Sequence, residues 1–219
     1  MYHTCAFTAS INSTSLTNLA ALADNVLTIE NSRFALRKNY QLVAVFALGV
    51  NLARARVNTP SLRQVTLPEL VPLGIAAEPS NLPQICDYRN SPIELAANEN
   101  FGIDVAEAGV GVQCYGVACI ASPGLTPAPR RGSYTLRGTA TTTLTANEWT
   151  PLSVSWDDTL PAGMYNVIGL RTQSAGCIAS RIRFEDQLFR PGSVGNDGGD
   201  DYGDKIFRNG GMGVYGQFN

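Results

Sequence analysis

The chain has 219 residues, of which 44% are hydrophobic and 16% are charged, and its net charge is −2. A chain of this length can bury a full core as one all-β domain. The small negative charge argues against a nucleic-acid-binding protein that works by bulk positive charge. Because charged residues form about 25% of an average soluble protein, much of this surface must be neutral.

Lysine is the scarcest charged residue, since Lys38 and Lys205 are the only two, against fourteen arginines. A guanidinium group loses less on desolvation than the strongly hydrated ammonium group, and it makes planar contacts. Arginine without lysine is therefore typical of a surface that neighbouring molecules cover. Ordinary compositional drift gives the same balance, and both explanations stay open.

The cysteines and the apolar runs of the sequence indicate the cellular compartment in which the chain is expected. The five cysteines are Cys5, Cys86, Cys114, Cys119 and Cys177. They are odd in number and form no C-x-x-C pair, which favours free thiols and a reducing compartment over a disulfide framework. The first residues contain no cationic segment followed by an apolar one, and the longest apolar run, Leu42–Val50, is about half of the ~20 residues that a membrane-spanning helix needs. We therefore expect a protein that is soluble as made, with no transmembrane segment.

Residues 1–23 are rich in Ser, Thr, Asn and Ala and have only a loose apolar pattern. We interpret them as an N-terminal arm that lies over the domain or over a neighbour. The arm is not basic, because the first forty residues contain only three cations, Arg33, Arg37 and Lys38. A strand is expected next, at Asn25–Ile29.

The run Tyr40–Val57 is predicted to be a long strand. In its first half apolar residues occupy both alternating faces, which is typical of a strand buried on both sides. Ala, Leu and Arg dominate Leu52–Arg56, so a helix remains the alternative there. Five prolines then make Asn58–Asn90 incompatible with central strands, and we interpret this segment as a long crossover that covers a sheet edge or contacts a partner.

Strands are expected to resume at Ile93–Ala97, Phe101–Val105 and Val110–Ser122, where apolar residues alternate. The following loop, PGLTPAPRRG, is a stiff connector that carries Arg130 and Arg131. We predict that these two arginines contact a neighbouring subunit or an anionic ligand. Two solvated loop arginines are the alternative.

The segment Ser133–Phe184 is predicted to form four consecutive antiparallel strands. Its short runs of Thr, Val, Ile, Leu and aromatic residues are separated by turn residues, and they alternate with a period of two. Ile168, Leu170, Ile182 and Phe184 are the expected core residues. Together the elements predict an all-β antiparallel sandwich of about eight strands over residues 24–190, with a jelly roll as the expected topology.

Residues 191–219 form a Gly-rich C-terminal tail with too few apolar side chains to bury itself. Four apolar residues near its end are expected to dock on an adjacent subunit: Met212, Val214, Tyr215 and Phe218. Four acids in the same tail could provide the hard oxygen ligands that calcium prefers: Asp197, Asp200, Asp201 and Asp204. Their spacing fits no EF-hand loop, and a solvated loop is the default interpretation.

Catalytic chemistry has little support in the sequence. His3 is the only histidine, which excludes a zinc site built on several imidazoles and places the only imidazole base in the expected arm. Glycoside hydrolysis needs only two carboxylates, but no pair of acids alternates along one strand face beside aromatic residues. The adjacent Asp157 and Asp158 lie in an expected turn, where aspartates usually satisfy backbone amides. We therefore predict that the chain is not an enzyme and needs no cofactor, with calcium as the open possibility.

The predicted sandwich, the arms at both ends and the four-strand block with its Gly-rich tail resemble a single jelly-roll viral capsid protein. The resemblance implies self-assembly into a virion shell after synthesis in the host cytoplasm. It implies copies of itself and other virion proteins as partners. Many capsid families have a basic N-terminal arm, which this chain lacks, so direct binding of nucleic acid through such an arm is not expected. The alternative is a lectin-like sandwich that binds a carbohydrate near Trp149, Trp156 and Tyr165.

Overall fold

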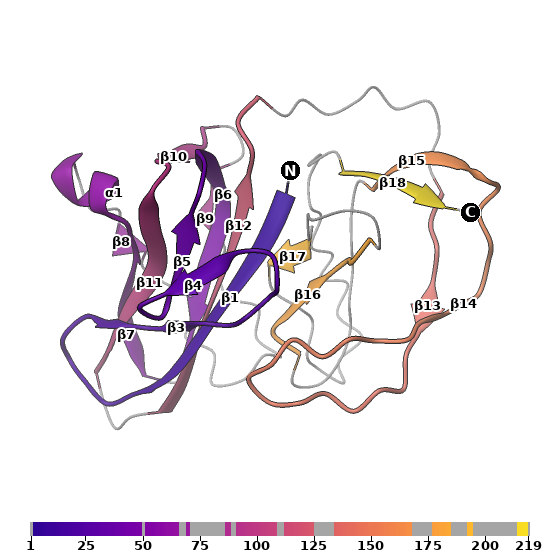
Figure 1. Cartoon of the computed structure of the whole chain (residues 1–219). Coiled ribbons are helices and arrows are strands. Elements are labelled where there is room, and N and C mark those ends of the chain that lie inside the picture. Colours follow the sequence, from indigo (N-terminus) through magenta and orange to yellow (C-terminus); the bar gives the residue numbers. More distant parts are fainter. Residues whose placement is uncertain are drawn as a thin grey trace.

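The computed structural model describes residues 2–49, 51–65, 69–70, 86–88, 91–108, 112–124, 134–167, 177–184, 192–194 and 214–218. Two six-stranded antiparallel sheets pack against each other as a β-sandwich (Figure 1). The prediction of an all-β antiparallel sandwich is therefore confirmed. Within the described ranges, no helix has the length and apolar character needed to cross a membrane.

The first sheet has the order β10–β6–β12–β1–β3, and β9 also pairs with β6. Its strands are β1 (Tyr2–Ile11), β3 (Ala20–Ala21), β6 (Tyr40–Leu48), β9 (Cys86–Asp87), β10 (Ile93–Leu95) and β12 (Val112–Ala121). The second sheet has the order β4–β5–β11–β7–β8, and β2 also pairs with β11. Its strands are β2 (Thr17–Asn18), β4 (Thr28–Glu30), β5 (Arg33–Leu36), β7 (Leu52–Asn58), β8 (Glu69–Leu70) and β11 (Glu99–Glu107). The short helix α1 (Pro60–Val65) follows β7.

Eight of these strands follow a regular pairing rule. In chain order they are β1, β5, β6, β7, β8, β10, β11 and β12. The first pairs with the eighth, the second with the seventh, the third with the sixth, and the fourth with the fifth. Two further pairs, β12 with β6 and β11 with β7, complete the sheets. Residues 2–121 thus run as one long antiparallel ribbon that is wound over itself into two layers.

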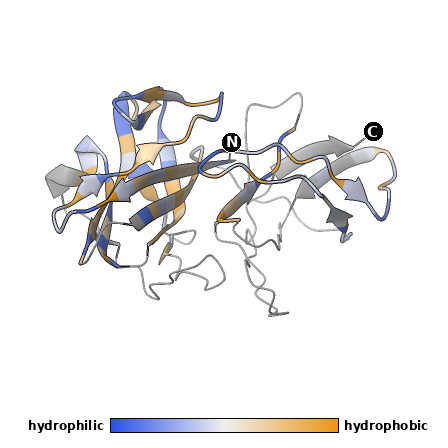
Figure 2. Cartoon of the chain, turned by 90° about the horizontal axis from the view of Figure 1, so that it is seen from below, coloured by the Kyte–Doolittle hydropathy of each residue, from blue (hydrophilic) through white to orange (hydrophobic). Residues whose placement is uncertain are grey.

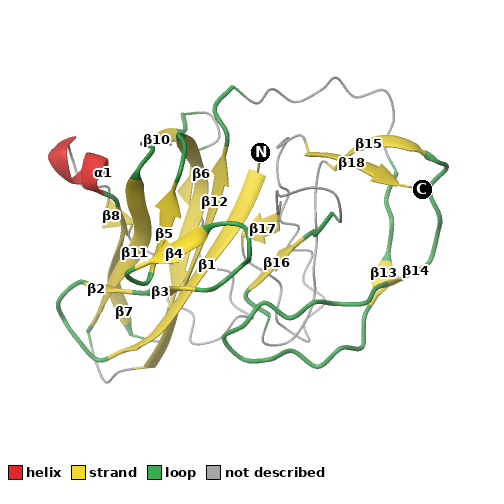
Figure 3. Ribbon diagram, in the orientation of Figure 1, coloured by secondary structure: helices red, strands yellow, loops and turns green. Residues whose placement is uncertain are grey.

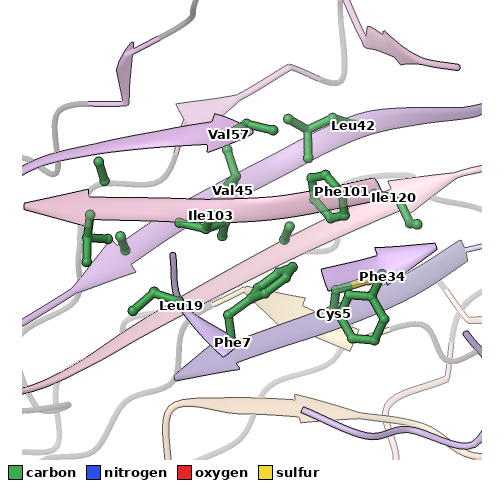
Figure 4. Packing of buried hydrophobic residues seen from close by; sticks show 14 of the residues in the cluster. Cys5, Phe7, Leu19, Phe34, Leu42, Val45, Val57, Phe101, Ile103 and Ile120 are labelled. Atoms are coloured by element: carbon green, nitrogen blue, oxygen red, sulfur yellow. The ribbon is translucent and has the colours of Figure 1, made fainter. Parts of the chain in front are cut away.

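The main hydrophobic core lies between the two sheets (Figure 4). Phe7 on β1 lies at its centre and is 1% exposed. Its ring meets Phe34 on β5 and Phe101 on β11 edge to face, with centroids 5.3 and 5.6 Å apart. These contacts join the first sheet to the second through aromatic packing, which contributes beyond the buried area alone.

The first sheet also buries its outer face, away from the second sheet. This second cluster consists of Val43, Ala44, Phe46, Leu48, Val117, Cys119 and Ala121. Val43 and Ala44 are neighbours in sequence but belong to the same cluster, because the pairing of β6 with β12 shifts by one residue between Cys119 and Ile120. Ile178, Ala179 and Phe184 from the C-terminal part of the chain pack against this face.

The N-terminal arm predicted over residues 1–23 is wrong for Tyr2–Ile11. This segment is β1, which pairs with β12 over its whole length and with β3 at Phe7 and Thr8. Small Thr, Ala and Ser side chains hide the alternation of this strand in the sequence. The strand prediction for Tyr40–Val57 is confirmed over its two halves, which form β6 and β7 in different sheets. Gly49, which follows β6, lets the chain pass close to Cys114, because a Cβ at Gly49 would lie 2.8 Å from Sγ of Cys114.

The prediction of four consecutive antiparallel strands over Ser133–Phe184 is confirmed only in part, because the described residues of this range contain four short strands but these do not form one sheet. The described strands of this part and of the tail are β13 (Gly138–Thr139), β14 (Ser155–Trp156), β15 (Gly163–Val167), β16 (Ala179–Arg181), β17 (Gly192–Val194) and β18 (Val214–Phe218). They pair as β13 with β14, β15 with β18 and β16 with β17, and Figure 3 shows a long loop between β13 and β14. Ile182 and Phe184 are half-buried, while Ile168 and Leu170 lie outside the described residues. Of the two that are described, Phe184 packs against the outer face of the first sheet and not in the main core.

Replacing Phe7 with Ala should lower the free energy of unfolding by about 3–5 kcal/mol, because it removes the ring that joins the two sheets. Urea unfolding followed by fluorescence measures this change. The control is Tyr134→Ala, which removes a ring that is 66% exposed and should change stability by less than about 0.5 kcal/mol. Equal effects of the two substitutions would contradict the placement of the core.

Candidate functional site

The buried carboxylate of Asp24 joins the N-terminal strand to the C-terminal part of the chain. Nε2 of His3 donates to Oδ2 of Asp24 over 2.6 Å, and both side chains are almost fully buried. Nη1 of Arg181 on β16 lies 3.5 Å from the same carboxylate oxygen and 3.4 Å from the carbonyl oxygen of Thr4. Three segments that are distant in sequence therefore meet at one carboxylate, and we call this group the Asp24 cluster.

Local backbone geometry positions Asp24. Its Oδ1 accepts hydrogen bonds from the backbone N–H groups of Val26 and Leu27, both at 2.9 Å. Asn25, which lies between Asp24 and Val26, has a φ of 61°, which asparagine tolerates better than most residues. Burial would raise the pKa of Asp24, but the hydrogen bonds from His3, Leu27 and Val26 lower that pKa below its usual value. Asp24 is therefore held as an anion inside the protein.

Arg181 extends the cluster to the long loop that precedes it. Its guanidinium carbon lies 3.9 Å from the ring centroid of Trp149, in a cation–π contact. On the neighbouring strand, a Cβ at Gly192 would lie 2.2 Å from the carbonyl oxygen of Ser180 and 2.7 Å from Oγ1 of Thr4. Only glycine lets β17 approach β16 and β1 this closely. The β16–β17 pair therefore covers the outer face of the first sheet, and Arg181 fastens it there.

A second charged group lies on the outer face of the second sheet. Asp104 on β11 is 3% exposed, and its carboxylate accepts hydrogen bonds from Nη2 of Arg33 at 3.3 Å and from Nε and Nη2 of Arg56 at 3.2 and 3.1 Å. The side-chain amide of Asn58 also donates to it. Two arginines share one aspartate here, so the group carries a net positive charge.

Two further acids, Glu99 and Glu107, form hydrogen bonds within the fold. Glu99 accepts hydrogen bonds from the hydroxyl of Thr59 and from the backbone N–H and hydroxyl of Ser61, at the start of α1. Burial would raise the pKa of Glu99, but these hydrogen bonds lower it. Sγ of Cys114 donates to the buried carboxylate of Glu107 over 3.0 Å. Burial and this hydrogen bond raise the pKa of Cys114 to about 12, so its thiol is not a ready nucleophile.

The five cysteines are free thiols, as the sequence predicted. Cys5, Cys114 and Cys119 are buried, and Cys86 and Cys177 are half-buried. Burial raises the pKa of Cys5, Cys119 and Cys177 as well. Their role is packing.

Residues 134–163 form an extended arm that contacts the covered sheet through Trp149, which packs against Arg181. Almost every residue in it is exposed, and before Gly163, where β15 begins, its only strand pairing is the short contact of β13 with β14. Figure 1 shows it as a long loop beyond β16, and Figure 2 shows hydrophobic residues recurring along it. The side chains of Tyr134 and Trp156 are 66% and 56% exposed. Large aromatic surfaces at this exposure are typical of residues that contact another molecule.

Several residues singled out in the sequence lie outside the described part of the structure. They are the connector arginines Arg130 and Arg131, the tail residue Met212, and the calcium candidates Asp197, Asp200, Asp201 and Asp204. Across the ranges that are described, no three His, Cys, Asp or Glu side chains gather closely enough to hold a metal ion. Both the interface role and the calcium site of these residues stay predictions.

Three of the four tail residues that were predicted to contact an adjacent subunit lie in the C-terminal strand. Val214, Tyr215 and Phe218 lie in β18, whose backbone pairs with β15 of the same chain. The tail that we expected to reach an adjacent subunit is thus tied to its own chain at this strand. A Gly-rich segment can become ordered by backbone pairing as well as by the docking of its side chains. The prediction from the sequence rested on side-chain docking alone. Whether these side chains also contact a neighbour stays a prediction.

The three aromatic residues of the lectin-like alternative have different surroundings. Trp149 is half-buried under Arg181, whereas Trp156 is exposed and lies over Gly138. The hydroxyl of Tyr165 donates to the carbonyl oxygen of Pro161, and its ring meets Tyr134 edge to face. Trp149 and Tyr165 are therefore already engaged within the chain.

The Asp24 cluster was not predicted from the sequence. Asp24 lay at the edge of a segment that looked like an arm, and Arg181 looked like an outward residue of a strand. The Asp24-Asn25 pair is typical of a turn that satisfies backbone amides, and it was the one available indication. Comparisons of the chain with protein-family models, with curated proteins and with solved structures gave no match.

The variant Asp24→Asn should be less stable than the wild type by about 3 kcal/mol or more at neutral pH, because it removes the charge that offsets Arg181 in a buried site. The folded pKa of Asp24 lies below the unfolded value of about 3.9, so ionised Asp24 stabilises the fold above about pH 4. That contribution is lost as the pH falls from about 4 through the folded pKa. Urea unfolding in acid should therefore show a smaller loss of stability for Asp24→Asn than for the wild type.

The matched control for this measurement is Asp157→Asn, since Asp157 forms an exposed pair with Arg137 at 3.6 Å. Exposed pairs contribute little, so its curve should follow the wild type at every pH. Parallel acid curves for the wild type and Asp24→Asn would contradict the lowered pKa of Asp24.

The variant Arg181→Gln should loosen residues 177–184 from the outer face of the first sheet. Losing the contacts with Asp24, Thr4 and Trp149 leaves a buried carboxylate poorly paired, at a cost of about 1–3 kcal/mol. Hydrogen exchange measured by mass spectrometry should speed up about tenfold or more in this segment, since ~1.4 kcal/mol corresponds to tenfold. Arg183→Gln changes an exposed arginine of the same segment and should leave exchange unchanged. If both variants exchanged alike, Arg181 would not be the fastening residue.

Proposed function

We propose that this chain is a structural subunit of a viral capsid, which assembles with copies of itself into the virion shell. It has no catalytic role in this proposal. It would be synthesised in the host cytoplasm and would have other virion proteins as additional partners.

The strand pairing supports a jelly-roll topology. A jelly roll is an eight-stranded antiparallel ribbon wound into two sheets, in which the first strand pairs with the eighth and each inner pair follows. The pairs β1–β12, β5–β11, β6–β10 and β7–β8 agree with this rule. Jelly rolls occur both in viral capsids and in lectins, so the topology alone does not choose between these functions.

The observation that carries the capsid proposal is the extended arm 134–163. The sandwich of residues 2–121 has a filled core, so the arm adds nothing to that core. An extended segment with exposed Tyr134 and Trp156 costs conformational entropy and leaves apolar surface in water. A neighbouring subunit that covers the arm would offset both costs. A lectin needs no such arm.

The position of the N-terminal segment also supports a shell subunit that does not contact the genome directly. Tyr2–Ile11 is built into the first sheet and cannot act as a free basic arm. We also keep Arg130 and Arg131, together with the tail residues Met212, Val214, Tyr215 and Phe218, as proposed contacts between subunits.

Purified protein at physiological ionic strength should form particles or rings of uniform size. Negative-stain electron microscopy and sedimentation velocity measure this, from low to high protein concentration. Assemblies larger than a dimer are the expected result. A monodisperse monomer at all concentrations would overturn the proposal. If the mobility of that monomer also shifted when a glycan was added, the result would favour the lectin-like alternative.

A further inference from the structure

The outer face of the second sheet carries a charged group that the proposed function does not use. In Figure 1 this sheet lies on the side of the sandwich away from β16 and β17. The group consists of Arg33 on β5, Arg56 and Asn58 on β7, and Asp104 on β11, and we call it the Asp104 cluster. The side chains of Arg33 and Arg56 are each 21% exposed, whereas that of Asp104 is 5% exposed. Two cations therefore face solvent above a buried anion.

Arg33 reaches Asp104 by lying across a glycine. A Cβ at Gly102 would lie 3.0 Å from Cγ and 3.2 Å from Cδ of Arg33, so the aliphatic part of the arginine passes directly over Gly102. Beyond this point Nε of Arg33 donates to Oδ1 of Asn18 over 2.9 Å, and Nη2 donates to Oδ1 of Asp104 over 3.3 Å. The guanidinium group is thus held at two of its three nitrogen atoms.

Arg56 approaches the same carboxylate from the neighbouring strand. It lies opposite Asp104 in the register of β7 with β11. Its Nε and Nη2 donate to Oδ2 of Asp104 over 3.2 and 3.1 Å, and the amide of Asn58 donates to the same oxygen. Both oxygens of Asp104 therefore have donors from the protein. The aspartate acts as a buried support that holds two guanidinium groups close together.

The charges of this cluster do not balance. Two arginines and one aspartate leave one positive charge in excess. The nearby strand positions Arg54 and Glu69 contribute one charge of each sign and leave this excess unchanged. Two like charges at short range repel each other, and an anion from solvent would reduce this repulsion.

Both guanidinium groups keep donors for such an anion. The hydrogen bonds of Arg33 use Nε and Nη2, and those of Arg56 use the same two atoms. Within the described residues, Nη1 of neither arginine has a hydrogen-bond partner, and neither atom belongs to the buried polar atoms that lack one. Nη1 of Arg33 and Nη1 of Arg56 therefore face solvent, and each carries two N–H groups.

We propose that Arg33 and Arg56 together bind a phosphate ion on the outer face of the second sheet. Guanidinium groups bind phosphate and carboxylate through directed, charge-assisted hydrogen bonds. The four oxygens of phosphate point in different directions, so that one ion can accept from Nη1 of both arginines. A carboxylate offers two oxygens in one plane, and chloride has no directed acceptor sites. This inference goes beyond the proposed function and does not depend on assembly.

The site lies at the surface, and this limits its affinity. Water and dissolved salt screen charges that are partly exposed, so each contact contributes less than it would in a buried pocket. We expect a dissociation constant of about 1–10 mM for inorganic phosphate. Binding should weaken as sodium chloride is added, because the attraction is electrostatic.

Nitrogen-15 NMR of the arginine Nε–H groups tests the proposal on the unmodified chain. Inorganic phosphate, titrated at constant ionic strength, should shift the Nε signals of Arg33 and Arg56 saturably. Arg37 is the internal control, because it is 66% exposed and pairs only 2.6 Å from Glu30. Its Nε signal should show no saturable shift. The absence of saturable shifts at Arg33 and Arg56, or an equal shift at Arg37, would overturn the proposal.

A double variant separates two positioned arginines from net charge alone. Asp104→Asn combined with Arg56→Gln removes one charge of each sign, so the cluster keeps its excess of one positive charge and has no poorly paired carboxylate. Phosphate binding should nevertheless weaken by about tenfold or more, because one of the two guanidinium groups is gone. The matched control Arg54→Gln removes an exposed arginine from the same strand and should change the affinity by less than about threefold. Unchanged binding in the double variant, or an equal loss in the control, would contradict the site.

The same titration with dimethyl phosphate identifies the source of the phosphate. This probe represents the diester of a nucleic-acid backbone and carries a single charge. It should bind more weakly than inorganic phosphate, because fewer of its oxygens can accept from the two arginines. Tighter binding of dimethyl phosphate at Arg33 and Arg56 would overturn the assignment to a phosphate ion and would indicate a backbone diester as the ligand.

Discussion

The structure depends on a sheet that is apolar on both faces. β6 and β12 alternate between two clusters, so that Leu42, Val45 and Ile120 face the second sheet while Phe46 and Val117 face the opposite way. A sheet of this kind is stable only when both faces are covered. The wound ribbon of residues 2–121 covers one face by itself. The other face is covered by the segment around Ile178 and Phe184, so this segment belongs to the folded domain.

Polar interactions fix how that second cover is placed. Hydrophobic contact has little directional preference, whereas the buried carboxylate of Asp24 accepts donors only from certain directions. Arg181 meets this carboxylate and the carbonyl oxygen of Thr4, and it sets the position of β16 on the sheet. Trp149 then packs on Arg181, which links the tip of the extended arm to the same point. A chain of contacts thus runs from the N-terminal strand through one ion pair to the arm.

This arrangement relates folding to the proposed assembly. The sandwich uses its apolar residues inside, and the arm keeps Tyr134 and Trp156 outside. Evolution tolerates exposed apolar surface when a partner covers it, because the free energy of burial then contributes to association. A subunit built in this way can fold first and assemble afterwards. The arginine-rich, lysine-poor composition agrees with a surface that is used for contacts.

The sequence by itself determined the all-β class, the strands in Tyr40–Val57 and Phe101–Ser122, and the free thiols, because these follow from local alternation and composition. Alternation also predicted Ile182 and Phe184 as core residues, but they are half-buried, and alternation could not say which surface covers them. Only the tertiary structure decided that Tyr2–Ile11 is a strand within the sheet, since its small residues become informative only beside β12. It also decided that Asp24 and Arg181 meet, and that the Thr-rich run 134–163 lies outside the core. These outcomes depend on contacts between residues up to 177 positions apart, and no local pattern encodes which distant segments share a surface.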